Sequence, residues 1–198
     1  MKALLLLLSL SLFAINPSDA VETDRVERNL KSLQNFLGWD PGVFIIETKH
    51  VENAVATQAA ILVNPDWIEN LSDQEIMAVV AHELAHVKHR HLAERLAIYA
   101  GGFVNAIFDF KNEMGFSERF SGFRSYFSTT QEISADCTAY NWLSEMRAKG
   151  YAVDEKALAS VFKKSTPFIE DFESYGLVNE PVYVRYKKIM KGHPHECH

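Results

Sequence analysis

The hydrophobic pattern of this chain predicts helices more often than strands. Between residues 21 and 37 the apolar side chains fall four, three and four positions apart, at Val26, Leu30, Leu33 and Leu37. This spacing places them along one stripe of an amphipathic helix. Gly38 follows at the position where helices commonly end. We therefore expect a helix over residues 21–37.

Two stretches have the composition of β-strands. Residues 43–48 are rich in β-branched and aromatic side chains, and a Pro41-Gly42 turn precedes them. Residues 53–63 are small and apolar on either side of Gln58, and Pro65 ends that stretch. We expect one strand from each of the two segments.

A clear helix start precedes the most regular helical stretch. Ser72 is a favourable N-cap residue, and Glu75 three positions later completes a capping box. The apolar residues that follow keep a helical period, at Ile76, Val79, Val80, Leu84 and Val87. A helix therefore runs from Ser72 through the motif described below.

Three more helices are predicted toward the C-terminus. One covers residues 129–149 and ends at Gly150, one runs from a cap at Asp154 to Lys163, and one begins at Pro181 and reaches Lys191. Residues 101–128 are aromatic and interrupted by glycines, which favours an irregular excursion with short helices. The pattern as a whole predicts one α+β domain over residues 21–198, mainly helical with a small β-sheet.

The first twenty residues have the features of a signal peptide. Lys2 precedes a continuous apolar run over residues 3–15, and small residues stand at the -3 and -1 positions of a cleavage site after Ala20. The run is short for a bilayer span, although an uncleaved anchor is the alternative. We expect residues 1–20 to be removed and the mature protein to be periplasmic or secreted.

Composition and charge narrow the classes of partner. The 198 residues are 47% hydrophobic and 23% charged, which suits a folded domain with a core rather than a disordered chain. The net charge of -6 gives no electrostatic basis for nucleic-acid binding, so no nucleic acid is expected. No second apolar stretch of spanning length follows, so no membrane span is expected in the mature chain. The pattern specifies no oligomeric state.

The sequence His82-Glu83-Leu84-Ala85-His86 is a His-Glu-x-x-His motif on the predicted capped helix. Residues four apart lie on one helix face about 6 Å apart along the axis, so two imidazoles can converge on one ion. Glu83 can then reach a water at the metal as general base. The alternative is a coincidental pair of surface histidines. The motif predicts a zinc ion, one per chain, held by His82 and His86.

A catalytic zinc site needs a third protein ligand. His89 shares a face with His82, but seven residues rise about 10.5 Å along a helix, which is too far. His91 points to another face, and both histidines are interpreted as solvated residues late in the helix. Glu132 is the better third ligand, because Asp136 follows one turn later and can hold a ligand histidine by its other N–H. The alternative is a solvated acidic helix face.

These linked motifs resemble the gluzincin zinc metallopeptidase family of HtpX and CAAX prenyl protease 1. The resemblance rests on His-Glu-x-x-His, on His91 five residues later, on Glu-x-x-x-Asp some fifty residues on, and on the segment Asn53-Ala54-Val55-Ala56. It covers roughly residues 30–149. The absence of the hydrophobic spans of membrane-bound members points to a soluble, exported branch.

The resemblance implies a zincin-like metalloprotease domain, with zinc bound as described above. Its β-sheet would present an edge strand, residues 53–63, that lines the active site and pairs with an extended polypeptide substrate. It also implies that His193, in a late His-Pro motif, stabilises the transition state. The Arg that usually follows that motif in the family is missing after His193.

The C-terminal tail offers two further hypotheses. Cys137 and Cys197 are the chain's two cysteines, and in an exported protein they are expected to form a disulfide, with two unpaired buried thiols as the alternative. If His193 returns to the site, as the resemblance implies, Cys197 arrives near Cys137. Tethered in this way, His195 or His198 could occupy the open position of the zinc and hold the enzyme inactive. A solvated tail is the alternative.

The leading functional hypothesis is a zinc-dependent endopeptidase that hydrolyses unfolded or damaged envelope proteins. The alternative is a non-catalytic, metal-binding or chaperone-like assembly factor of the cell envelope. The presence of Glu83 favours the peptidase, because a protein that only binds zinc has no need of a base beside its first ligand.

Overall fold

The computed structural model describes residues 17–94 and 127–192. The predicted signal peptide up to residue 16, most of the excursion at 101–128, and the tail from His193 onward lie outside the described residues. Helix α1 covers Pro17–Leu37, so it begins four residues before the predicted start, with proline at a position that suits the first turn. Its stripe of Val26, Leu30 and Leu33 is buried as expected.

The described residues form a three-stranded sheet in the order β1-β3-β2. Strand β1 (Phe44–Glu47) pairs in parallel with β3 (Ala60–Val63), and β2 (Ala54–Ala56) pairs antiparallel with β3. The prediction of one strand over residues 53–63 is therefore wrong. Thr57 turns the chain, because its Oγ1 accepts the N–H of Ala60 and donates to the Ala60 carbonyl. Of the predicted strand, only the residues of β2 lie at an edge of the sheet, because β3 is its central strand.

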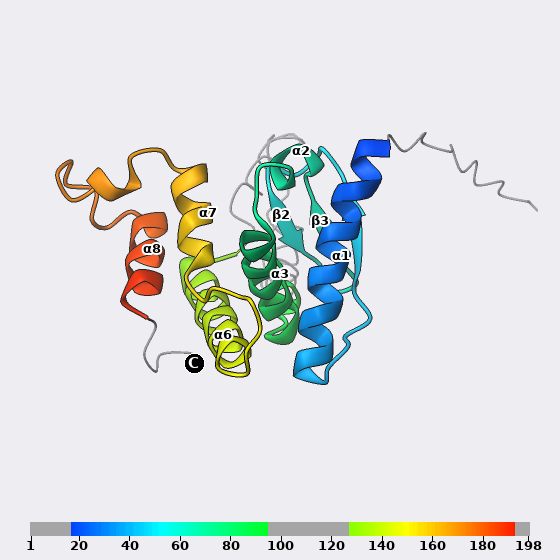
Figure 1. The fold of residues 1–198 in the computed structure, drawn as a ribbon. Coiled ribbons are helices and arrows are strands. Elements are labelled where there is room, and N and C mark those ends of the chain that lie inside the picture. The colour runs from blue at the N-terminus through cyan, green and yellow to red at the C-terminus, as the bar shows by residue number, and fades with distance from the viewer. Residues whose placement is uncertain (1–16, 95–126, 193–198) are drawn as a thin grey trace, which may run out of the picture.

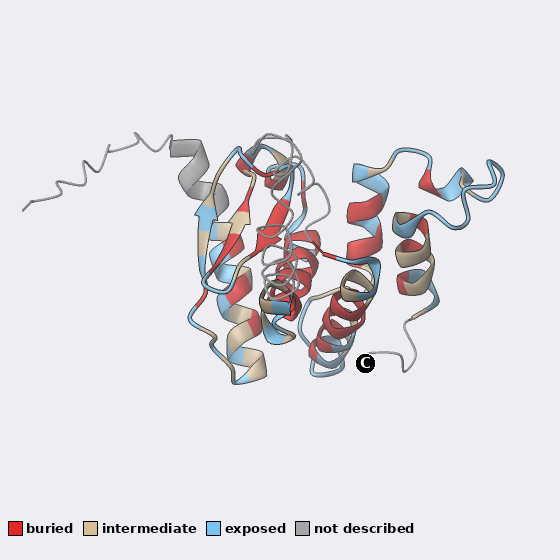
Figure 2. Ribbon diagram, turned by 180° about the vertical axis from the view of Figure 1, so that it is seen from behind, coloured by how far each residue is buried: buried red, intermediate tan, exposed pale blue. Residues whose placement is uncertain are grey.

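Helix α3 (Asp73–Lys88) begins as predicted after a short helix that was not predicted, α2 (Pro65–Ile68). Ser72 accepts the N–H of Glu75, and the Glu75 carboxylate accepts the N–H of Ser72. The helix is buried over most of its length, from Glu75 to His86 (Figure 2). The residues of the metal-binding motif are thus part of the core.

The described residues from 127 to 192 contribute three α-helices and one short 3-10 helix. These are α6 (Thr129–Ala148), α7 (Ala157–Ser165), η2 (Ile169–Asp171) and α8 (Pro181–Lys191). Helix α6 has its own capping box, in which Ser128 and Gln131 exchange hydrogen bonds. Helix α7 starts three residues later than expected, because Asp154 accepts the N–H of Lys156 in a turn that precedes the helix.

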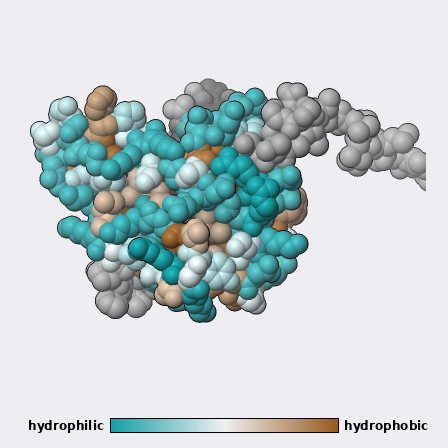
Figure 3. All heavy atoms as spheres, viewed as in Figure 1, coloured by the Kyte–Doolittle hydropathy of each residue, from teal (hydrophilic) through white to brown (hydrophobic). Residues whose placement is uncertain are grey.

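Helix α3 is the centre of the molecule (Figure 1). It packs against α1 on one side, α6 and α7 on the other, and β2. This arrangement confirms the expected α+β fold with a small sheet. The face turned to the viewer in Figure 3 is mainly hydrophilic, with small separate apolar areas. Within residues 17–94 and 127–192, no helix has the length and apolar character needed to cross a membrane.

Candidate metal centre

Three side chains from α3 and α6 bring possible ligand atoms to one point. Nε2 of His82 lies 3.0 Å from Nε2 of His86 and 3.3 Å from Oε2 of Glu132. Nε2 of His86 lies 3.7 Å from Oε1 of Glu132. Ligands about 2.1 Å from a tetrahedral zinc ion would lie about 3.4 Å from one another. The donor set and its spacing therefore fit zinc.

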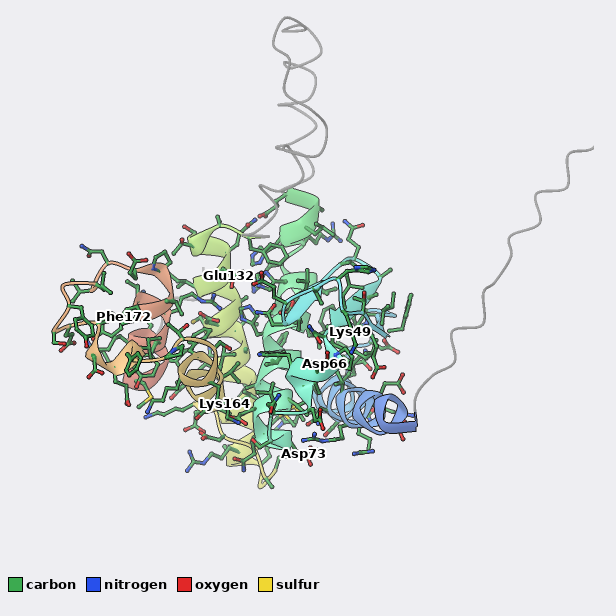
Figure 4. The ribbon with its side chains drawn as sticks, turned by 90° about the horizontal axis from the view of Figure 1, so that it is seen from above. Lys49, Asp66, Asp73, Glu132, Lys164 and Phe172 are labelled. Carbon is green, nitrogen blue, oxygen red and sulfur yellow. The ribbon has the colours of Figure 1, made fainter. Side chains whose placement is uncertain are left out.

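Local sequence signals position this cluster. His82 and His86 lie one turn apart on α3, whose start is fixed by the Ser72 capping box. Glu132 is in the first turn of α6, four residues after its N-cap Ser128. Figure 4 shows Glu132 on the side of α6 that faces α3. The predicted third ligand is thus brought to the two histidines, and the idea of a solvated acidic helix face is wrong.

Asp136 and Arg185 form a buried charged layer behind the cluster. Oδ1 of Asp136 lies 2.9 Å from Nδ1 of His82, as expected for an acceptor that orients a ligand histidine. The guanidinium of Arg185 donates two hydrogen bonds to Asp136, at 2.7 and 2.9 Å. Its third nitrogen lies 2.8 Å from Oε2 of Glu132. Arg185 therefore links Glu132 and Asp136 of α6 to α8.

Arg185 was not predicted as a site residue, although the sequence contains a pattern that indicates it. Pro181 correctly predicted the start of α8, and Arg185 lies one turn later on the same side as Val182 and Ile189. A cation on the packed side of a short helix implies a buried anionic partner. Two such anions were already assigned on α6.

His91 is also at the site, contrary to the interpretation that it is solvated. It is 5% exposed, and its Nδ1 lies 2.8 Å from Nδ1 of His86. His89 is partly buried, with Nε2 2.8 Å from the Thr138 hydroxyl. The ring of Phe127 stacks on His86 with centroids 3.8 Å apart. His89 is not part of the cluster of His82, His86 and Glu132, whereas His91 and Phe127 contact His86.

A break in α3 explains the position of His91. The helix ends at Lys88, and Arg90 has a φ of 56°, in the left-handed region that non-glycine residues rarely adopt. The prediction assumed a continuous helix, in which a residue five positions after His86 faces elsewhere. The reversal at Arg90 turns the chain back, so that His91 reaches the ring of His86.

The buried charges shift the protonation of the cluster. Burial lowers the pKa of His82, but Asp136 and Glu132 outweigh that effect and raise it to about 10. Burial disfavours the charged form of Asp136, yet the neighbouring Arg185 holds its pKa well below the usual range. A metal ion at His82 would therefore replace a proton, which is the expected competition at a histidine ligand.

Glu83 connects the motif to the sheet. Its Oε2 accepts the N–H of Ala56 at 2.6 Å. Burial raises the pKa of Glu83 to about 7, although the charge of His82 and the Ala56 N–H oppose the shift. A carboxylate with a pKa near neutrality can both take and return a proton. This pKa and the position of Glu83 beside the cavity are compatible with a base, and its catalytic role stays a prediction.

A cavity of about 430 Å³ opens onto these groups. Its lining includes Asn53, Ala54 and Val55 next to the motif, together with apolar residues of α7 such as Leu158 and Phe162. The strand that was expected to line the active site therefore borders the same space as the cluster. This space is large enough for part of a peptide.

The proposed contributions of the tail stay predictions. His193, His195, His198 and Cys197 all lie outside the described residues. Cys137 is buried on α6 next to Asp136, the position from which a pairing with Cys197 was inferred.

Comparison with known proteins adds family information. The sequence pattern of peptidase family M48 matches residues 21–197. An uncharacterized protein of Aquifex aeolicus (strain VF5), aq_aa15, is 39% identical over 77 residues, which span 36% of this chain and 69% of that protein. No solved structure matches.

Proposed function

The chain belongs to peptidase family M48, and from this membership we propose that it is a zinc-dependent endopeptidase acting on unfolded or damaged proteins of the cell envelope. The observation that carries the proposal is the geometry of one cluster. Three ligand atoms of His82, His86 and Glu132 lie within 4.8 Å of one another, with the carboxylate of Glu83 on the same helix. A site that only stores zinc needs no such base.

We assign one zinc ion per chain to His82, His86 and Glu132. Three protein ligands leave one position for water or substrate, as in catalytic rather than structural zinc sites. When bound, zinc would polarise the scissile carbonyl and lower the pKa of a water to about 7. Asp136 and Arg185 hold His82 and Glu132 in the orientation that this binding requires.

Glu83 carries the proton in the proposed reaction. Its carboxylate takes a proton from the attacking water as the water oxygen bonds to the carbonyl carbon. It then delivers that proton to the amide nitrogen as the C–N bond breaks, and the products are a carboxylate and an amine. The hydrogen bond from Ala56 holds Oε2, so Oε1 is the oxygen left for this transfer.

Strand β2 supports an extended polypeptide as substrate. The backbone carbonyl of Asn53 accepts the N–H of Asn64, and the N–H of Thr57 donates to the carbonyl of Ala60. The backbone polar groups of residues 53 and 57 therefore point toward β3. Because hydrogen bonds alternate along an antiparallel strand, Ala54 and Ala56 face the free edge. The side chain of Asn53 accepts the N–H of Ala54, and the carboxylate of Glu83 accepts the N–H of Ala56. Both outward N–H groups are therefore hydrogen-bonded within the protein. No other strand of residues 17–94 and 127–192 pairs with this edge, so its outward carbonyls can accept N–H groups of a substrate strand.

Export of the protein is part of the proposal. The apolar run over residues 3–15, followed by small residues up to Ala20, supports a cleaved signal peptide. Peptide mass measurement on protein from an expressing bacterium should find a mature chain that begins at Val21. A cytoplasmic chain that retains residue 1 would refute this part.

An exported protein would also allow the Cys137–Cys197 disulfide, and with it the proposed tail gate. Non-reducing mass spectrometry of periplasmic protein should find the cross-linked peptide rather than two thiols. His195→Ala or His198→Ala should then raise hydrolysis if that histidine blocks the zinc. Unchanged or lower rates would eliminate the gate. His193 is assigned to transition-state stabilisation, so the His193→Ala protein should hydrolyse peptide more slowly.

The second candidate is a metal-binding or chaperone-like envelope factor without turnover. The buried Arg185, Asp136 and Glu132 network would serve either function, because it stabilises a metal site whether or not the site is catalytic. The base Glu83 and the outward carbonyls of β2, which can pair with a substrate strand, favour hydrolysis.

Hydrolysis of casein and of an internally quenched peptide tests the proposal. The protein should cleave both within the chain, lose activity with a chelator, and regain it when one equivalent of zinc is restored. A protein that binds one zinc and cleaves neither substrate would favour the second candidate. Cleavage that persists in excess chelator would rule out the metal site.

A further inference from the structure

His91 makes the second polar contact of the ligand His86. The two Nδ1 atoms lie 2.8 Å apart, and both rings are buried. A contact of this length between two ring nitrogens requires one proton between them. The protein therefore has to set which of the two imidazoles donates.

The position of Nε2 of His86 decides which of the two rings donates the proton. Nε2 of His86 faces the cluster, 3.0 Å from His82 and 3.7 Å from Glu132. To bind a metal there, Nε2 has to be bare, so a neutral His86 carries its proton on Nδ1. That proton then points at His91, which accepts it on its own Nδ1.

From this geometry we propose that His91 is a positioning residue, which accepts the Nδ1–H of His86 and so fixes the ring and tautomer that present Nε2 to the metal. The inference rests on the metal site of the proposed function. It adds an assignment for a side chain that supplies no ligand and touches no substrate.

The surrounding structure holds His91 in place for this contact. The left-handed backbone of Arg90 returns the chain to α3, in a conformation that is unfavourable for a residue with a side chain and that the rest of the fold has to offset. Gln131 of α6 donates to the carbonyl of His91. His89 stacks on one side of the His91 ring, with the planes inclined by 15°. Strained backbone is retained where it serves a specific contact.

The two ligand histidines thus have acceptors of different charge. His82 faces the carboxylate of Asp136, whose charge Arg185 compensates. His86 faces an imidazole, which accepts a hydrogen bond without adding a negative charge. A second carboxylate at His91 would be buried with no cation assigned to it, and such a charge is costly.

Substitutions at His91 separate positioning from packing. In His91→Asn, the side-chain oxygen can take the place of Nδ1 and accept the same hydrogen bond, whereas His91→Leu fills the space without an acceptor. Zinc affinity, measured by chelator competition, should fall about 10–100-fold in His91→Leu and return close to the wild-type value in His91→Asn. His50→Ala changes an exposed histidine that lies outside the cluster, so it is the matched control and should keep the wild-type affinity.

A spectroscopic measurement on the unaltered protein makes the test independent of folding defects. In the zinc-loaded, 15N-histidine-labelled protein, Nδ1 of His86 should carry a proton and show scalar coupling through the hydrogen bond to Nδ1 of His91. A His86 Nδ1 without that coupling overturns the inference, as does wild-type affinity in His91→Leu.

Failure of the inference and failure of the proposed function give different results. A wild-type protein that binds zinc and cleaves peptide while His91→Leu binds zinc equally well refutes only the assignment of His91. A wild-type protein that binds no zinc refutes both.

Discussion

Buried charge is the organising feature of the site at the scale of residues. Glu83 and Asp136 are buried carboxylates and Glu132 is a partly buried one, and Arg185 is the cation that pairs with Asp136 and Glu132. Isolated buried carboxylates would be unstable, whereas paired and hydrogen-bonded ones are tolerated. The ligands are therefore positioned by a network that spans α3, α6 and α8.

Asp136→Asn tests the support of His82. The amide is neutral and can present a donor instead of an acceptor, so His82 should lose its fixed orientation. Zinc affinity is expected to fall about 10–100-fold in a chelator competition. Asp66→Asn, an exposed acid paired with Lys49, is the control and should bind zinc as tightly as the wild type. Full affinity in Asp136→Asn would refute the role of this carboxylate.

Arg185→Met tests the compensating cation. Removing Arg185 takes away the two hydrogen bonds of its guanidinium to Asp136 and leaves His82 to compensate that buried carboxylate, and breaking a buried ion pair costs up to about 3–5 kcal/mol. Urea denaturation of the metal-free protein should show that loss in the free energy of unfolding. Arg147→Met removes a more exposed pair with Glu155 and should lose much less. Equal losses in the free energy of unfolding would mean that the ion pairs of Arg185 stabilise the fold no more than the exposed pair of Arg147 does.

At the scale of elements, α3 serves both the core and the site. It is buried from Glu75 to His86, so the same helix that carries the ligands contacts α1, α6, α7 and β2. Both ligand-bearing helices start with a serine capping box, at Ser72 and Ser128. The capping boxes thereby fix the residue at which each helix begins. They also fix the position of each ligand residue along its helix axis.

Glu75 gives this element a measurable pH dependence. Its carboxylate is buried but accepts from Ser72 and from Lys164 of α7, and these contacts lower its pKa. A carboxyl group with a lowered folded-state pKa stabilises the fold above its unfolded-state pKa, and that stabilisation is lost as pH falls through the folded value. Glu75→Gln should therefore cost roughly 1–2 kcal/mol at neutral pH.

The same difference should shrink below about pH 4.5, the ordinary pKa of a solvated Glu side chain. Unfolding measured at pH 7 and at pH 3.5 provides the comparison, with the exposed Glu69→Gln as control. A cost that does not change with pH would show that the charge of Glu75 does not contribute.

The sequence predicted what depends on local signals. Helical periodicity, the Ser72 capping box and the Pro181 start gave helices close to those observed, and the spacing of His82, His86 and Glu132 gave the cluster. The turn at Thr57 was missed because no glycine, proline, asparagine or aspartate marks it between residues 54 and 63. His91 and Arg185 were missed because their positions depend on a left-handed residue and on packing between α6 and α8.

At the scale of the whole molecule, the metal would join two halves of the chain. His82 and His86 come from the half that includes the sheet, and Glu132 comes from α6 in the second half (Figure 1). A ligand that binds only the folded state stabilises it by mass action. Zinc at about 100 times its dissociation constant should add roughly 3 kcal/mol, or about 5–10 °C in melting temperature.

Scanning calorimetry with zinc and with excess chelator measures this stabilisation. Glu132→Ala should remove most of the zinc-dependent increase while leaving the chelated melting temperature near its wild-type value or below it. A zinc-dependent increase that survives in Glu132→Ala would place the third ligand elsewhere.

The most direct test of the account is the zinc content and turnover of Glu83→Gln, measured on the same preparation. Gln keeps the size of the side chain but cannot take a proton, and it leaves His82, His86 and Glu132 untouched. The account predicts one zinc per chain with hydrolysis of the quenched peptide reduced by several orders of magnitude, because proton transfer contributes about 10²–10⁴-fold and water activation is lost with it. A Glu83→Gln protein that holds zinc and cleaves at the wild-type rate would contradict the central claim.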